Sequence, residues 1–141
     1  MQCRDQCRTP WWNEYVGLPF ADKGRTREGC DCWGLVRLVL HEQFGIDLPS
    51  YTDDYTSTAD NAGIAGAIDS NMAGWRIVPP GEAREGDVAL FRIGGLPLHV
   101  GVVIGDVRYM LHVCMGIDAC TEQYRAPRWL SRLEGVDRPE G

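Results

Sequence analysis

The sequence lacks any apolar run long enough to cross a membrane, and it lacks an apolar stretch typical of an export signal. Its first residues, MQCRDQCRTPWW, are charged and polar instead. We therefore expect a chain without membrane insertion that is synthesised in a reducing cytoplasm. Basic charge is also scarce: 14 Lys and Arg against 20 Asp and Glu give a formal net charge of -6. This balance argues against a nucleic-acid partner.

The chain is short, and its length of 141 residues favours one compact domain over residues 1–141. It has six cysteines. Without an export signal, these are better interpreted as thiols, metal ligands or a nucleophile than as a disulfide framework. Cys30 and Cys32 are too close in sequence to form an unstrained bridge with each other.

Helical spacing of apolar residues begins at Cys32 and continues to Phe44. Asp31 is a suitable N-cap for this helix, and Gly45 suits the position just after its end. A second, shorter helix is predicted within AGIAGAIDSNM, residues 62–72. Its inward-facing residues would be Ile64, Ile68 and Met72.

The second half of the chain is dominated by strand patterns. The runs GDVALFRI, LHVGVVIG and RYMLHVC are rich in β-branched or aromatic residues and are separated by turn residues, which predicts an antiparallel meander. A helix followed by such a sheet indicates an α+β domain. The polar stretch LPSYTDDYTSTADNAG is predicted to be a surface loop. Near the C-terminus, Trp129, Leu130 and Leu133 are expected to dock on the core.

Two histidines are predicted to meet across neighbouring strands. Gly105-Asp106 suits a two-residue type II′ hairpin, which would place Ile104 opposite Val107. Counting outward from that turn places His99 directly opposite His112. Directly opposed residues share a face of the sheet, so the two imidazoles would touch.

Gly101 would lie on the same face as the two histidines and would leave room for a close approach. The opposite face would be filled by Val100, Val102 and Ile104. If the start of the predicted helix packs against the face cleared by Gly101, Cys32 would lie beside both histidines.

Cys32 is the stronger candidate for a reactive cysteine. It occupies the first helical turn, where unpaired N–H groups and the helix dipole favour a thiolate and are expected to lower its pKa. Cys30 precedes the cap and receives less of this effect. A nucleophilic cysteine also needs a base and a group that orients the base. His99 and His112 would supply them.

A metal site remains the alternative interpretation of the same residues, because cysteine and histidine are the usual ligands of zinc. The tetrahedral set would be Cys32, His99, His112 and Cys114. Cys3 and Cys7 could share a helical face and join such a site. The spacings match no compact zinc motif, so the preferred interpretation contains neither a metal nor another cofactor.

Three linked motifs carry a resemblance to a known family. GCDCWGLVRLV, EGDVALFR and LHVGVVIGDVRYMLHV resemble, in that order, the motifs of the NlpC-type cell-wall peptidases, which are papain-like enzymes. The resemblance extends from about Tyr15 to Val113. YVGLPF and DCWGLVRLVLHEQFGIDLP further resemble the peptidases of bacteriophage tails and gene transfer agents, in which Trp follows the cysteine.

The resemblance implies hydrolysis of peptidoglycan stem peptides, typically at the bond between D-glutamate and diaminopimelate, through a thioester. Cys32 would be the nucleophile, His99 the base and His112 the orienting residue. The backbone N–H of Cys32 would help to bind the oxyanion. Many members carry Tyr where this chain has Phe20, so that donor is missing unless Tyr15 or another group replaces it.

The branch implies tail hub or tail-tip proteins as partners and a location at the tail tip of a phage-like particle, with action in the periplasm or cell wall. A catalytically inactive or zinc-binding structural tail protein is the alternative. Because stem peptides are anionic, we expect a cationic contact, and Arg25 is the candidate, with Arg27 and Arg37 also near Cys32 in sequence. The neighbouring Trp11 and Trp12 could form an exposed docking patch.

Overall fold

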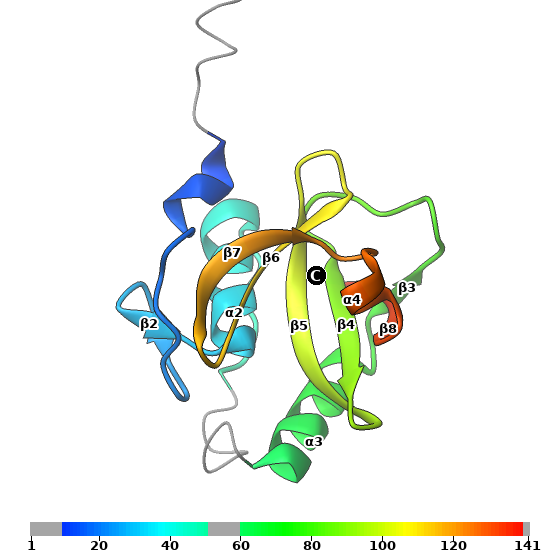
Figure 1. The fold of residues 1–141 in the computed structure, drawn as a ribbon, viewed down its shortest axis with the longest axis horizontal. Coiled ribbons are helices and arrows are strands. Elements are labelled where there is room, and N and C mark those ends of the chain that lie inside the picture. Colours follow the sequence, from blue (N-terminus) through cyan, green and yellow to red (C-terminus); the bar gives the residue numbers. More distant parts are fainter. Residues whose placement is uncertain (1–9, 51–59, 140–141) are drawn as a thin grey trace, which may run out of the picture.

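The computed structural model describes residues 10–50 and 60–139 (Figure 1). Within these ranges no helix has the length and apolar character needed to span a bilayer. The elements are, in chain order, η1 (Trp11–Glu14), β1 (Arg25–Thr26), β2 (Gly29–Cys30), α2 (Cys32–Phe44), α3 (Asn61–Met72), β3 (Arg76–Val78), β4 (Val88–Ile93), β5 (Leu96–Ile104), β6 (Tyr109–Cys114), β7 (Ile117–Gln123), α4 (Pro127–Leu130) and β8 (Leu133–Arg138).

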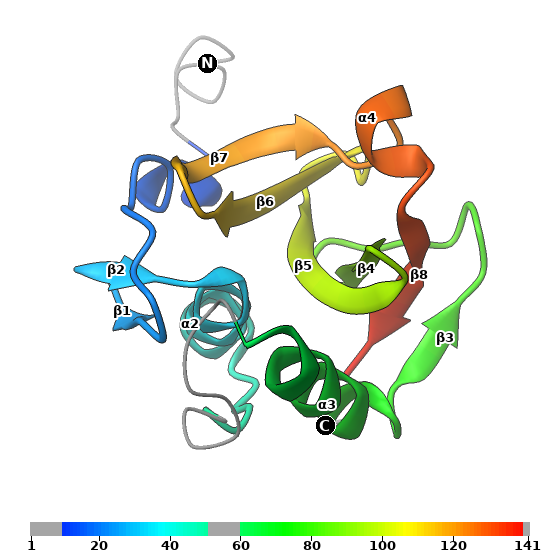
Figure 2. The same cartoon turned by 60° about the horizontal axis from the view of Figure 1, so that its bottom comes forward.

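The main sheet has six strands in the order β3-β8-β4-β5-β6-β7, with antiparallel neighbours. The predicted meander is confirmed as β4, β5 and β6, and so is the α+β class. The sequence did not predict β3, β7 and β8. The sheet bends strongly between β5 and β6, and α2 lies in the angle between its two halves (Figure 2).

Both predicted caps of α2 are present. The Asp31 carboxylate accepts a hydrogen bond from the backbone N–H of Gly34 at 2.8 Å, and Gly45 ends the helix in the left-handed conformation with φ of 68°. Gly34 also allows close packing. A Cβ atom there would lie 2.0 Å from the carbonyl oxygen of Gly24, so only glycine fits where the loop crosses the helix.

The second helix, α3, is confirmed together with its inward-facing residues. Ile68 and Met72 are buried, and Ile64 is half-buried against the same core. The predicted loop between α2 and α3 falls largely on residues 51–59, which lie outside the described ranges.

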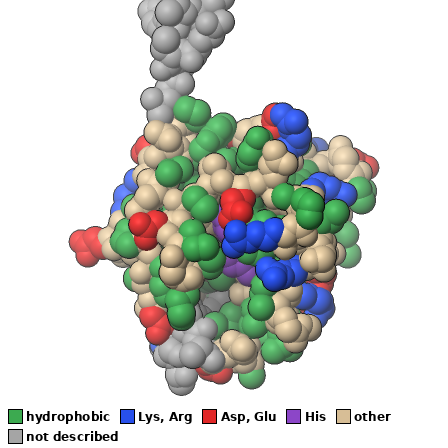
Figure 3. All heavy atoms as spheres, viewed as in Figure 1, with side chains coloured by type: hydrophobic (Ala, Val, Ile, Leu, Met, Phe, Trp, Pro, Cys, Tyr) green, Lys and Arg blue, Asp and Glu red, His purple; other side chains and the backbone are tan. Residues whose placement is uncertain are grey.

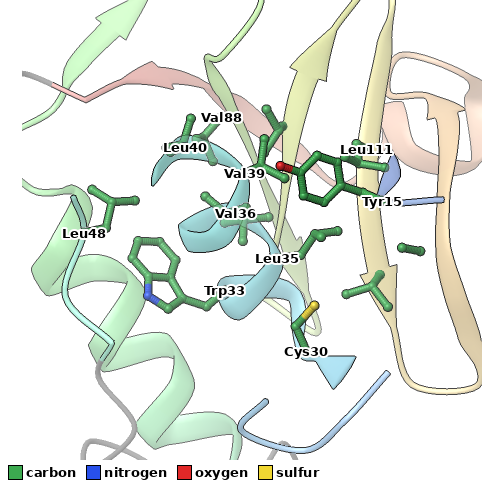
Figure 4. Close-up of a cluster of buried hydrophobic side chains, with 14 of the residues drawn as sticks. Tyr15, Cys30, Trp33, Leu35, Val36, Val39, Leu40, Leu48, Val88 and Leu111 are labelled. Atoms are coloured by element: carbon green, nitrogen blue, oxygen red, sulfur yellow. The ribbon is translucent and has the colours of Figure 1, made fainter. Parts of the chain in front are cut away.

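The sheet has two apolar faces with different partners. The face toward α2, here called the helix face, packs β5 and β6 against that helix (Figure 4). Its buried residues include Leu35, Val36, Val39, Val100, Val102 and Ile104. The opposite face, here called the histidine face, includes Phe91, Val103, Met110 and Trp129.

The predicted register between β5 and β6 is wrong by two residues. Ile104 pairs with Tyr109 rather than with Val107, because the turn contains four residues, 105–108, instead of two. An even shift keeps every side chain on its predicted face, whereas an odd shift would have reversed them all. His112 consequently packs over Gly101, where a Cβ atom would lie 3.2 Å from that of His112.

The predicted exposed tryptophan pair is also corrected. Trp11 and Trp12 are half-buried and pack on the core, with their rings edge to face at 5.6 Å. Trp11 further contacts Tyr15 and Phe44. These contacts give the pair a structural role in holding η1 on the domain.

Candidate active site

Cys32 opens onto a cavity of about 140 Å³ at the start of α2. Its thiol faces the backbone of β5, where Sγ lies 3.7 Å from the carbonyl oxygen of Leu98. The cavity is lined by Phe20, Asp31, Cys32, Trp33, Ile64, Ala67, Ile68, Leu98, His99, Val113, Cys114 and Met115. Cys32 and His99 therefore share one mostly apolar cavity.

The predicted contact between the two histidines is present. Nε2 of His99 lies 2.9 Å from Nδ1 of His112, and both rings are buried. Nδ1 of His99 is the ring nitrogen that remains for another partner. This arrangement matches the sequence prediction in its outcome, although the register that led to it was wrong.

Cys32 and the histidines meet in a different way from the one expected. The start of α2 does not pack on the histidine face, because α2 lies against the helix face instead. Pairing between β5 and β6 extends only from Ile104 to Val102, next to the turn. Further along, residues of both strands line the cavity that Cys32 enters from α2.

Glu122 extends the histidine pair into a chain of three side chains, and sequence reasoning missed it. Oε2 of Glu122, on β7, lies 2.7 Å from Nε2 of His112. A carboxylate only accepts, so His112 carries its proton on Nε2 and offers the lone pair of Nδ1 to the N–H of His99. His99 is thereby left with an unprotonated Nδ1. We call His99, His112 and Glu122 the imidazole–carboxylate chain.

Trp129 covers this chain on the histidine face. Its ring stacks on His99 at 5.2 Å with an angle of 17°, and it meets His112 edge to face at 5.2 Å. Its indole N–H donates to Oε1 of Glu122 at 3.2 Å. The predicted docking on the core is therefore confirmed for Trp129, whose partners are the two imidazoles, and for the half-buried Leu133. It is wrong for Leu130, which is 47% exposed.

The expected lowering of the Cys32 pKa is not found. Burial raises the pKa of the thiol to about 12, and this outweighs the opposite effect of the nearby backbone N–H groups of Val100 and Trp33. Burial likewise lowers the pKa of His99 to about 3, with further lowering by His112 and Arg128. The resting pair is thus a neutral thiol and a neutral imidazole.

The hydroxyl donor that Phe20 cannot provide is not supplied by Tyr15. Phe20 lines the cavity, whereas Tyr15 is fully buried elsewhere and donates its hydroxyl to Glu42 at 2.7 Å. The donors positioned near the sulfur are main-chain groups at the start of α2 and on β5.

Arg25, the predicted cationic contact for the substrate, is not among the residues that line the cavity. Its guanidinium donates to Asp31 at 2.8 Å and to the carbonyl oxygen of Ser50 at 2.6 Å, and its side chain is 11% exposed. It ties the N-cap of α2 to the following loop. Arg27 and Arg37 are also engaged, with Glu42 and with the carbonyl oxygen of Leu48.

A different cation lies near the site. Arg128 of α4 is exposed and approaches Oε1 of Glu122 at 3.7 Å. In Figure 3 a small area of histidine surface near the middle of the face is bordered by Lys or Arg and by acidic side chains. Sequence reasoning missed Arg128 because it is far from Cys32 along the chain.

The predicted zinc set is not the one that the fold assembles. Among the described residues, the potential ligand atoms that lie within 4.8 Å of one another belong to His112, Cys120 and Glu122. Cys3 and Cys7 lie outside the described residues. Cys30 is fully buried and does not line the cavity, and burial raises the pKa of its thiol to about 11.

A model described as the NlpC/P60 family matches residues 17–138. The chain belongs to the NlpC/P60 family. Among its NlpC/P60 relatives, the Murein DD-endopeptidase MepS/Murein LD-carboxypeptidase of Escherichia coli (strain K12) is 27% identical over 125 residues, which cover 89% of this chain and 57% of the relative. The Probable endopeptidase NlpC homolog of Haemophilus influenzae is 30% identical, with 86% and 58% covered.

Solved structures show the same NlpC/P60 fold. The NlpC/p60 domain of peptidoglycan hydrolase SagA superposes with a TM-score of 0.62 at 18% identity and covers 91% of this chain and 92% of that one. An NlpC/P60 family protein from Bacillus cereus ATCC 10987 gives 0.63 at 22% identity, with 88% and 36% covered. The chain spans little more than half the length of the two relatives compared above.

Proposed function

We propose that this chain is a cysteine peptidase that cleaves peptidoglycan stem peptides at the bond between D-glutamate and diaminopimelate. The observation that carries the proposal is the cavity shared by Cys32 and His99, in which Nε2 of His99 is hydrogen bonded to His112. Membership of the NlpC/P60 family, in which relatives are named murein endopeptidase and peptidoglycan hydrolase, supports the substrate class.

In the first step Cys32 attacks the carbonyl carbon of the scissile amide. The thiol starts neutral, so its proton moves to Nδ1 of His99 as the carbon–sulfur bond forms. The imidazolium keeps its Nε2–H on His112, whose Nδ1 accepts it. The carbonyl oxygen gains the negative charge and is stabilised by the backbone N–H of Cys32 at the positive end of α2.

In the second step the carbon–nitrogen bond breaks. His99 returns the proton to the departing amine, which leaves a thioester on Cys32 and a neutral imidazole. Water then attacks the thioester carbon while His99 takes a proton from it, and the carbon–sulfur bond breaks. His99 returns the proton to the sulfur of Cys32, which regenerates the thiol and releases the carboxylic acid. The Glu122 carboxylate remains an acceptor throughout, so His112 keeps its proton on Nε2.

The test is mass spectrometry of muropeptides after incubation of reduced protein with diaminopimelate-type sacculi. The intact chain should cleave the D-glutamyl to diaminopimelate bond with or without a chelator, and Cys32→Ser should not. Cys30→Ser is the matched control, since Cys30 is two residues away and does not line the cavity. Equal cleavage by Cys32→Ser and the intact chain would refute the assignment of the nucleophile.

We further propose that the protein acts at the tail tip of a phage-like particle, bound to tail hub or tail-tip proteins, and opens the wall locally during entry. The support is the sequence resemblance of DCWGLVRLVLHEQFGIDLP to tail peptidases. Immunoblotting of particles purified on a density gradient should find the protein in the particle fraction. Its presence only in cell fractions without particles would exclude this location.

A further inference from the structure

Cys120 lies beside two members of the imidazole–carboxylate chain, His112 and Glu122, and the three side chains together have the chemistry of a metal site. His112 on β6 is paired directly with Cys120 on β7, and Glu122 follows two residues later, so all three project from the same face. Sγ of Cys120 lies 3.7 Å from Nε2 of His112 and 4.0 Å from Oε2 of Glu122. Cys120 and Glu122 are half-buried, so the group is accessible from outside.

The spacing suits a tetrahedral cation bound by nitrogen, sulfur and oxygen. Zinc bond lengths of about 2.0 to 2.3 Å place ligand atoms about 3.3 to 3.6 Å apart at tetrahedral angles. The two distances from Cys120 are close to this range, and the 2.7 Å contact between His112 and Glu122 would open by roughly half an ångström. A thiolate, an imidazole and a carboxylate favour Zn²⁺ over the hard cations Mg²⁺ and Ca²⁺.

Neighbouring side chains orient Glu122 and His112 through further hydrogen bonds. Oε1 of Glu122 accepts from the indole N–H of Trp129, which leaves Oε2 for the cation. The second ring nitrogen of His112 faces His99. Outer hydrogen bonds of this kind orient ligands at known metal sites.

We propose that His112, Cys120 and Glu122 bind a zinc ion and that its binding switches off the peptidase. The site lies outside the cavity. It uses Nε2 of His112, the nitrogen that donates to Glu122 in the proposed catalytic arrangement. The inhibitory half of the proposal depends on the proposed function, because it acts through His99 as the base.

Zinc binding would change which ring nitrogens of His112 and His99 carry protons. Binding releases the Cys120 thiol proton to solvent, and Nε2 of His112 gives up its proton to bind the cation through the lone pair. Each imidazole keeps one proton, so His112 now carries its proton on Nδ1 and donates to Nε2 of His99. His99 then carries its own proton on Nδ1, where it cannot accept the proton of Cys32.

The binding experiment is done in the Cys32→Ser background, which removes a thiol that lines the cavity with His99 and could compete for zinc. Equilibrium dialysis should find one zinc per chain. Adding Cys120→Ser should weaken zinc binding at least about tenfold and abolish the thiolate-to-metal absorption band of the cobalt form. Adding Cys114→Ser, a half-buried cysteine on the same strand as His112, should change neither. Circular dichroism checks that each variant is folded.

Unchanged zinc affinity after Cys120→Ser would overturn the site, as would binding that requires Cys32. The inhibitory half is tested with Cys32 intact, and each protein is compared with its own metal-free rate. Zinc should inhibit the natural chain but not Cys120→Ser. If zinc binds at Cys120 while cleavage continues, the switch is refuted and the peptidase assignment stands. If the protein cleaves nothing in the absence of metal but binds added zinc through Cys120, the zinc site stands and the peptidase assignment fails.

Discussion

The two faces of the sheet both bury apolar side chains but do different work. The helix face packs aliphatic side chains of β5 and β6 against α2 and so fixes where Cys32 stands. The histidine face also buries large side chains, but it encloses His99 and His112, which hydrogen bond to each other and onward to Glu122. One face positions the Cys32 thiol, and the other holds a hydrogen-bonded chain of titratable side chains.

The difference shows why a buried polar group need not be a defect. Both imidazoles are nearly inaccessible to water, but they hydrogen bond to each other, and His112 also hydrogen bonds to Glu122. Packing alone would tolerate an apolar residue at either position. The two faces should therefore respond differently to substitution.

The largest expected effect is on catalysis, from His112→Ala. Removing this ring leaves Nε2 of His99 without its acceptor, so His99 is free to adopt the wrong tautomer. We expect kcat/KM to fall by roughly 10² to 10⁴, the range for loss of a group that serves a general base. Kinetics on a purified stem peptide measure the change, and the exposed His41→Ala provides the control. A drop in His41→Ala as large as that in His112→Ala would contradict this account.

Acid should weaken the histidine face more than the helix face. Burial lowers the pKa of His99 to about 3, and burial also lowers the pKa of His112. Unfolded histidines titrate near 6.5, so between about pH 6.5 and pH 3 the unfolded chain binds more protons than the folded one. Stability is therefore lost as pH falls, by about 3 kcal/mol at pH 4 for His99 alone.

Urea unfolding at several pH values measures this loss of stability. His99→Gln should flatten the dependence on pH because it removes the group that gains a proton on unfolding. His41→Gln, which changes an exposed histidine, should preserve it. An unchanged pH dependence in His99→Gln would show that other groups carry the acid sensitivity.

Gly101→Ala should disturb the histidine face through sterics. A Cβ atom there would lie 2.8 Å from Sδ of Met110 and 3.2 Å from Cβ of His112. We expect a loss of about 1 to 3 kcal/mol in unfolding free energy, together with a lower kcat. Gly66→Ala is the matched control, because it lies inside α3 with open space around it and should stabilise by roughly 0.5 to 1 kcal/mol. Equal stability changes in the two variants would argue against crowding at His112.

The smallest effect is expected at the edge of the histidine face. Arg128 is an exposed cation near the site, so Arg128→Ala should raise KM for an anionic stem peptide by about fivefold, the value of one exposed charge contact. Arg108→Ala removes an exposed arginine at the far turn, where it pairs with Asp106. A rise in KM with Arg108→Ala as well would indicate a general charge effect rather than a contact.

The parts of the fold that could be predicted are those that depend on residue patterns within a single helix or strand. The spacing of apolar residues from Cys32, with a cap at each end, was sufficient to predict α2. Runs of β-branched and aromatic residues between turn signals were sufficient to predict β4 to β6. The contact between His99 and His112 was predicted from the wrong register. It survived because the error was an even number of residues.

The parts that could not be predicted depend on distant pairing. β7 carries the polar run IDACTEQ, which lacks the alternation of a half-buried strand, so Glu122 gave no sign of meeting His112. One signal was available: Met115-Gly116 is a two-residue turn, with Gly116 at φ of 83°, and it could have paired the following residues with β6. The raised pKa of Cys32 escaped prediction because burial depends on the whole fold.

The main-chain donor beside Cys32 has a consequence for how this site changes over evolution. The N–H of Val100 lies close to the sulfur, and every residue except proline provides the same group. Mutation at position 100 can therefore alter packing against α2 without deleting the donor. A hydroxyl such as the one absent at Phe20 is lost in a single substitution, whereas the backbone donor persists as the sequence drifts.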